Sequence, residues 1–252
     1  MFKTIILSAF GAGLAVGVAL SVVQAVTTEP LILHAETFEN AEPAPAVASA
    51  PHEHSSTEAH AHEAAAAPVA TEAAAPAHEH DEDAWSPADG FERSAYTLIA
   101  NLLMGVAVSA VLLGLMTIRG GKIDARTGVL WGVAGFFAAS LLPSLGLSPE
   151  LPGTAAAEIT SRQIWWLSTA AASAIGLALI VFSGSWLLKV AGLVIAVLPH
   201  VIGAPVPPTL EASYPAALGA EFVAASLVVS ALLWALSGLF SGWLYQRLSR
   251  SA

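Results

Sequence analysis

Three pairs of histidines occupy one stretch of the chain that is otherwise rich in alanine, proline and acidic residues. The pairs are His52 and His54, His60 and His62, and His78 and His80. Residues two apart point to the same side of an extended chain, so each pair can chelate one ion. Neutral imidazole binds cobalt, nickel, copper and zinc in preference to magnesium and calcium. The stretch therefore predicts loose, exchangeable binding of a transition metal ion, with a solvated acidic spacer as the alternative.

A second set of ionisable residues lies at or near the ends of apolar segments, where charged groups are costly and often functional. Its members are His34, Glu36, Glu158, His200 and Glu221. If they converge, their nitrogen and oxygen donors would form a metal site suited to Co²⁺ or Ni²⁺. Each of them could instead be an interfacial side chain held by water. Glu221 in particular lies where a negative charge stabilises a helix amino terminus.

The composition places these residues in a membrane protein. Hydrophobic residues make up 56% of the 252 residues and charged residues only 11%, whereas soluble domains carry about 25% charged residues. There is no cysteine, which excludes disulfides and thiolate metal sites. A net charge of −10 counts against binding nucleic acid. Because no nucleotide-binding loop and no catalytic constellation is present, we expect neither an enzyme nor a permanently bound cofactor.

The apolar runs predict an all-α, polytopic membrane helix bundle that forms a single membrane domain over residues 1–252. A helix needs about 20 mostly apolar residues to cross the hydrocarbon core of the lipid bilayer. The expected spans are 4–26, 94–118, 128–147, 164–182, 186–202 and 222–245. The fifth is short and contains Lys189, so a count of five spans is the alternative to six. Residues 27–93 should form one long extracytoplasmic loop, with a disordered, histidine-rich part at 40–84.

Basic residues predict the orientation, because cytoplasmic loops carry an excess of lysine and arginine. With six spans and a cytoplasmic amino terminus, seven of the nine basic residues face the cytoplasm. The seven are Lys3, Arg119, Lys122, Arg126, Lys189, Arg247 and Arg250, and only Arg93 and Arg162 fall outside. We therefore expect both termini in the cytoplasm and the histidine-rich loop outside, where an ion collector favours uptake.

Small residues recur at every fourth position in three of the expected spans. They are Ala9, Gly13, Gly17 and Ser21 in the first span, Gly128 and Gly132 in the third, and Gly238 and Gly242 in the last. This spacing makes a flat stripe on a membrane helix and predicts close helix packing. Pro143 should kink or end the third span.

Six blocks of the sequence resemble, in the same order, those of the CbtA family of prokaryotic membrane proteins, which are proposed cobalt transporter subunits. The blocks are PLILHAETFE, WSPADGFER, LSPELPGTAAAEITSRQIWWL, LPHVIGAPVP, AEFVAASL and SGWLYQRL. The resemblance implies a cytoplasmic (inner) membrane location, a small single-span partner of the CbtB type, and Co²⁺ as the transported ion. Two features depart from the family pattern: His34 replaces an expected acidic residue, and the histidine-rich insert is longer.

These observations favour a cobalt uptake permease subunit whose partners are a divalent metal ion, the lipid bilayer and a CbtB-type subunit. The residues alone leave nickel or another divalent transition metal open. A membrane sensor or chaperone that binds metal without transporting it is the main alternative, and a scaffold for a partner protein is another.

Overall fold

The computed structural model describes residues 2–39, 41 and 87–250, so the three histidine pairs lie outside the described residues. In the described part every named element is helical, which confirms the predicted all-α helix bundle. The elements are α1 (Phe2–Val26), α2 (Thr28–Glu39), α3 (Phe91–Arg119), α4 (Ala125–Phe136), the π-helical turn η1 (Phe137–Leu141), α5 (Leu142–Ser144), α6 (Ile159–Phe182), α7 (Trp186–Ile202) and α8 (Ala216–Arg250). The expectation of disorder at 40–84 falls on residues that, apart from residue 41, are not described.

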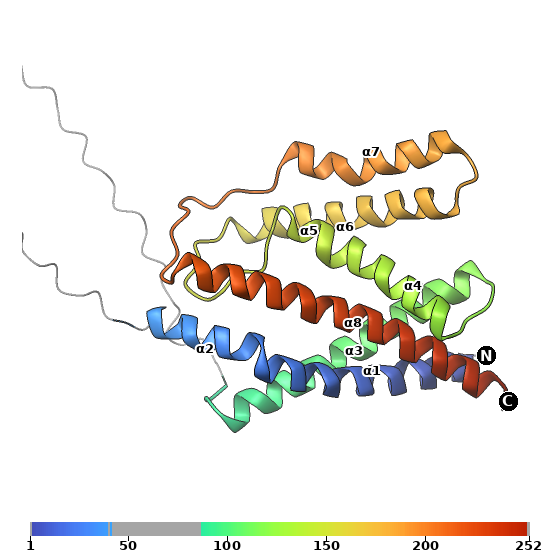
Figure 1. Cartoon of the computed structure of the whole chain (residues 1–252), viewed down its shortest axis with the longest axis horizontal. Coiled ribbons are helices and arrows are strands. Elements are labelled where there is room, and N and C mark those ends of the chain that lie inside the picture. Colours follow the sequence, from blue (N-terminus) through green and yellow to red (C-terminus); the bar gives the residue numbers. More distant parts are fainter. Residues whose placement is uncertain (1, 40, 42–86, 251–252) are drawn as a thin grey trace, which may run out of the picture.

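Five of these helical segments are long and apolar enough to cross a membrane: α1, α3, α4 to α5, α6 and α8. The sixth, α7, has 17 residues and is about 25 Å long at 1.5 Å per residue. It nevertheless brings the chain back along α6 (Figure 1). Both termini consequently lie at the same end of the bundle.

The third span, expected over 128–147 with a kink or an end at Pro143, is not one regular helix. It contains the π-helical turn η1 and ends at Ser144. Pro143 has no backbone N–H, and its ring crowds the carbonyl four residues earlier, at Ala139. A π-helical turn at Phe137–Leu141 widens the helix at that carbonyl, a common way to accommodate such an interruption. The π-helical turn η1 therefore accommodates Pro143 just before the span ends at Ser144.

The small-residue stripe of α1 packs directly against the backbone of α3, as the spacing predicts. A methyl group built on Gly13 would collide with the backbone of Val106, and one on Gly17 would lie 2.6 Å from the Leu102 Cα atom. Ser21 accepts a 3.0 Å hydrogen bond from the Asn101 side-chain amide across the same interface. The two helix backbones are therefore as close as glycine allows.

The stripes of the third and last spans pack against each other. A methyl group on Gly238 would lie 2.7 Å from the carbonyl carbon of Gly128, and Gly132 and Gly242 also meet backbone atoms of the facing helix. A third interface of the same kind joins α6 and α7, where a methyl group on Gly192 would lie 2.6 Å from the Gly176 carbonyl oxygen. The predicted close packing is thus confirmed.

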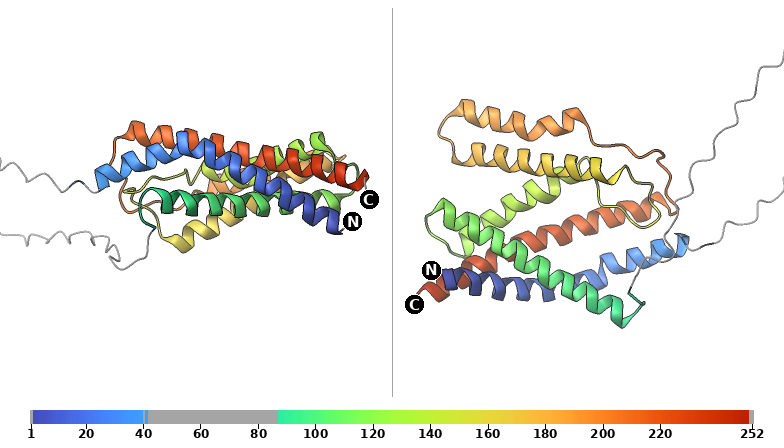
Figure 2. Two further views of the ribbon diagram at one scale, coloured as in Figure 1. Left: turned by 90° about the horizontal axis from the view of Figure 1, so that it is seen from below. Right: turned by 180° about the vertical axis from the view of Figure 1, so that it is seen from behind.

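The bundle is arranged with α7 at one edge, followed by α6, then α4 and α8, with α1 and α3 at the other edge (Figure 2). The last helix, α8, contacts α1, α2, α3 and α4. By contrast, α7 contacts α6 alone among the described helices. The bundle is therefore organised around α8, with the α6–α7 hairpin added at its edge.

The expected loop at 27–93 contains a helix at its start, α2, and the helix α3 begins at Phe91. Pro30 lies in the first turn of α2, where its missing N–H is not needed. The helix packs through Ala35 against Leu151 and Leu218, which belong to the α5–α6 loop and to α8. This small apolar cluster holds α2 on the end of the bundle opposite to the termini.

Candidate functional site

The end of the bundle opposite to the termini, here called the α2 end, carries all five residues of the second predicted set. It consists of four segments of the chain: α2, the first turn of α3, the α5–α6 loop at 145–158, and the stretch from the last turn of α7 through the α7–α8 loop at 203–215 to the start of α8 (Figure 1). The two loops are joined by an antiparallel bridge between Thr154 and Ala212. A 3.1 Å hydrogen bond from the Ser213 amide to the Gly153 carbonyl extends this bridge. The α2 end is therefore a connected surface built from four segments.

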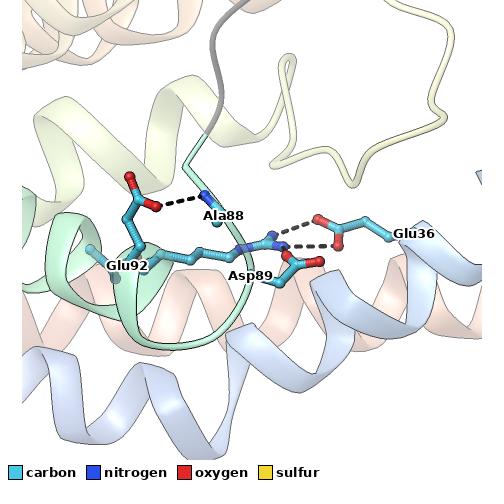
Figure 3. A network of polar contacts seen from close by, with 6 residues as sticks. Glu36, Ala88, Asp89 and Glu92 are labelled. Carbon is cyan, nitrogen blue, oxygen red and sulfur yellow. Dashed lines mark hydrogen bonds and ion pairs between the residues drawn. The ribbon is translucent and has the colours of Figure 1, made fainter.

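Glu36 is held by an arginine of α3 (Figure 3). The Arg93 guanidinium donates two hydrogen bonds to its carboxylate, at 2.9 and 2.5 Å, and a third to Asp89 at 3.3 Å. The side chains of Arg93 and Glu36 are only 26% and 28% exposed. A metal ion bound by Glu36 would therefore share or compete for carboxylate oxygens that Arg93 already occupies.

Glu158 caps the start of α6. Its carboxylate accepts hydrogen bonds from the backbone amides of Thr160 and Ser161, both at 2.7 Å, and from the Ser161 hydroxyl at 2.8 Å. Hydrogen bonds from Thr160 and then Ser161 lower the pKa of Glu158 from 4.5 to about 2. Glu158 is therefore ionised at any physiological pH and is already satisfied by the helix it begins.

Replacing Glu158 by glutamine should lower the thermal stability of the chain at pH 6, because the charged cap is lost. A carboxylate with a lowered pKa stabilises the folded state above its unfolded pKa, and this contribution disappears as the pH falls through the folded pKa. The difference in melting temperature between wild type and Glu158→Gln should therefore shrink between pH 4.5 and about pH 2. A difference that stays constant over this range would contradict the assignment of Glu158 as a charged cap.

The three other predicted residues occupy different surroundings. His200 packs edge-on against the Trp165 ring, with ring centroids 5.8 Å apart, and its Nε2 atom is buried with no hydrogen-bond partner among the described residues. His34 is exposed on α2 beside Phe38, and Glu221 is exposed near the start of α8. No group of three or more histidine and acidic side chains in the described part is arranged to hold a metal ion. The convergence considered from the sequence is therefore not found there, and metal binding by each residue remains a prediction.

A cavity of about 330 Å³ lies between the two joined loops, and the sequence did not predict it. Its wall includes Glu150, Arg162, Glu211 and Tyr214. Arg162 and Glu150 form an ion pair at 2.6 Å. A recess with carboxylates and a hydroxyl group can hold a hydrated cation through bridging waters. The only signal in the sequence was the density of polar residues in LSPELPGTAAAEITSRQ.

The sequence model of a family described as "Probable cobalt transporter subunit (CbtA)" matches residues 2–246. The chain belongs to the CbtA family. Neither a curated protein nor a solved structure matches this CbtA protein significantly. With its membrane-spanning helices, it is a multi-pass membrane protein, and its family is the one described as probable cobalt transporter subunits.

Five of the six blocks that resemble the family meet at the α2 end of this CbtA protein. PLILHAETFE forms most of α2, and the described part of WSPADGFER, residues 87–93, leads into the first turn of α3. The next three blocks supply the α5–α6 loop with the start of α6, the end of α7 with its following loop, and the start of α8. Only SGWLYQRL lies at the other end. These five blocks are thus gathered on one surface, although they are distant in the sequence.

Proposed function

We propose that this chain is the membrane-spanning subunit of a cobalt uptake permease in a prokaryotic cytoplasmic membrane. Both termini would lie in the cytoplasm and the α2 end would face outward. The observation that carries the proposal is the gathering of five family blocks at one end of a bundle of the CbtA family. That end would receive Co²⁺, and the ion would then follow a path between the packed helices.

The charges of the described residues support this orientation. Acidic residues of the α2 end are Glu29, Glu36, Glu39, Asp89, Glu92, Glu150, Glu158, Glu211 and Glu221, against the basic residues Arg93 and Arg162. The opposite end carries Lys3, Arg119, Lys122, Arg126, Lys189, Arg247 and Arg250 with Asp124. A basic end belongs in the cytoplasm, and an acidic outer end attracts divalent cations.

The histidine pairs belong to the connection between Glu39 and Pro87, and both of these residues lie at the α2 end. We propose that the pairs collect ions there. A chelating loop of this kind raises the local concentration of metal, so it should matter mainly when cobalt is scarce. A small single-span subunit of the CbtB type is the proposed partner, in keeping with the family's description as a transporter subunit.

The membrane potential is a sufficient driving force for such a path. Each positive charge gains about 2.3 kcal/mol per 100 mV on entering the cell. A divalent ion therefore gains about 4.6 kcal/mol, which supports roughly a thousandfold accumulation. An electrogenic path needs no nucleotide-binding site, and the sequence contains none of the Walker type.

Uptake of radiolabelled Co²⁺ by cells that produce the chain with its partner subunit tests the proposal. Uptake should exceed that of cells lacking the chain, and it should fall when the membrane potential is abolished. Replacing His200 or Glu221 by alanine should reduce uptake more than deleting residues 52–80. The deletion should lower uptake mainly at low cobalt concentrations. Glu29→Gln, a carboxylate of α2 outside the predicted ligand set, is the matched control.

Uptake that does not rise with the wild-type chain and its partner would reject the permease. A reporter inserted at position 65 tests the orientation, and its appearance in the cytoplasm would reject inward transport from the α2 end. Cobalt binding to the intact chain without any flux would instead support the second candidate, a membrane metal sensor or chaperone.

A further inference from the structure

The cavity of about 330 Å³ between the α5–α6 and α7–α8 loops has two carboxylates in its wall, those of Glu150 and Glu211. Glu150 accepts one hydrogen bond, from Arg162 to its Oε2 atom at 2.6 Å, and its Oε1 atom has no partner in the described part of the chain. The Glu211 carboxylate is exposed and has no hydrogen-bond or ion-pair partner there. The cavity therefore offers oxygen atoms that are available to a ligand, unlike the engaged carboxylates of Glu36 and Glu158.

The rest of the wall offers hydroxyl groups but too few acidic or imidazole side chains to coordinate a bare metal ion. Ser148, Thr209 and Tyr214 line the cavity, and no group of three or more histidine and acidic residues in the described part is arranged around one point. A hydrated ion needs no such group, because its waters donate hydrogen bonds to carboxylates and hydroxyls. Six waters at about 30 Å³ each occupy about 180 Å³. A divalent ion with its first water shell therefore fits the cavity.

Polar atoms continue beneath this cavity. A methyl group built on Gly146, which lines the cavity, would lie 2.7 Å from the Cζ2 atom of Trp165 and 3.0 Å from the Ala204 Cβ atom. The Trp165 ring is thus directly under the wall, and the residue is only 8% exposed. Its Nε1 atom and the Nε2 atom of the adjacent His200 are buried with no hydrogen-bond partner among the described residues. Buried donors and acceptors are normally satisfied, so these two atoms indicate a polar ligand or water on this side of the cavity.

We propose that the cavity binds a divalent metal ion together with its water shell, through hydrogen bonds from the waters to Glu150 and Glu211. The inference rests on the proposed permease and gives it an entry site, from which the ion moves toward Trp165 and His200. Arg162 offsets one of the two carboxylates, which leaves the wall with a net charge of −1. An ion on a permeation path must bind and also leave, and the guanidinium keeps the binding weak enough for release.

The test titrates the full-length chain in detergent with hexaamminecobalt(III) in a calorimeter. The six ammonia ligands of this probe do not exchange, so it binds only through its outer shell and the histidine pairs cannot coordinate it. We expect Glu150→Gln and Glu211→Gln each to weaken its affinity about tenfold, since each removes one attractive charge. Arg162→Gln should strengthen the affinity by a similar factor, because it removes the opposing charge.

Glu92→Gln is the matched control, because it removes one negative charge from the α2 end without lining the cavity. Its affinity should equal that of the wild type. Equal affinities in the Glu92, Glu150 and Glu211 variants would overturn the proposal, as would weaker binding by Arg162→Gln, which would indicate an anion instead. If the two ion-pair variants do not fold, Glu211→Gln and Glu211→Asp decide. Weakened binding by the first and near-normal binding by the second support the site, and any other combination rejects it.

This measurement does not depend on transport, so it separates the site from the permease. Probe binding that follows the expected order in a chain that takes up no Co²⁺ would support the site and reject the permease. Co²⁺ uptake by a chain whose probe binding ignores the two carboxylates would reject the site and leave the permease in place.

Discussion

Replacing Gly238 by alanine is expected to destabilise the bundle by about 1–3 kcal/mol, the usual cost of forcing an extra group into a packed interface. The added methyl group would lie 2.7 Å from the carbonyl carbon of Gly128 and 3.2 Å from the Gly132 amide nitrogen. Both are backbone atoms, so relief requires α4 and α8 to separate along their length. A lower thermal midpoint and a smaller monodisperse fraction in gel filtration would measure the effect.

Gly114→Ala is the control for this substitution. Gly114 lies within α3, and a methyl group built on it meets nothing within 4 Å. Both substitutions gain the same helix propensity, which favours alanine by about 1 kcal/mol in soluble helices. Only the Gly238 variant should lose stability, and Gly13→Ala at the α1–α3 interface should behave like it. Equal stabilities of the Gly238 and Gly114 variants would show that close approach of α4 and α8 does not support the fold.

Reversing the charge of Arg93 should release α2 from the bundle. In Arg93→Glu, Glu36 would lose its bidentate partner, and three carboxylates would face one another at positions 36, 89 and 93. Hydrogen bonds between charged groups contribute about 1.5–3 kcal/mol when they are partly shielded from water. We therefore expect faster amide hydrogen exchange along α2, with little change in α6 and α7, which do not contact it.

Exchanging the two charges, in the double variant Arg93→Glu with Glu36→Arg, should recover part of the protection of α2. Asp89→Asn provides a comparison, because its carboxylate is 88% exposed and exposed ion pairs contribute about 0–1 kcal/mol. If Arg93→Glu and Asp89→Asn change the exchange of α2 equally little, the ion pair does not hold this helix. The Ala35, Leu151 and Leu218 cluster would then suffice.

The sequence predicted which helix faces are flat, but it could not say which faces meet. Gly13 and Gly17 mark a stripe because their spacing matches a helical repeat, and this stripe lies against α3. The partner surface around Gly105 was missed, although Gly105 and Ser109 show the same spacing. Apolar length likewise predicted a bundle of membrane-spanning helices, of which five are long and apolar enough to cross a membrane, whereas the π-helical turn before Pro143 depends on local geometry that composition does not reveal.

The candidate site was less predictable, because the sequence does not show which group binds a given carboxylate. Glu36 and Glu158 have the residue type of a metal ligand, yet one is bound by Arg93 and the other by the amides that follow it. The pairing of Glu36 with Arg93 spans 57 positions, and the bridge between Thr154 and Ala212 joins two loops across two helices. Such long-range contacts arise from the arrangement of the whole bundle.

The central position of α8 has a consequence for biosynthesis. Ribosomes deliver this helix last, and it provides the surface against which α1 and the glycine face of α4 pack. The faces of α1 and α4 that pack against α8 therefore stay uncovered in the bilayer until residues 216–250 have been synthesised and inserted. Final assembly of the bundle therefore follows the translation of residues 216–250.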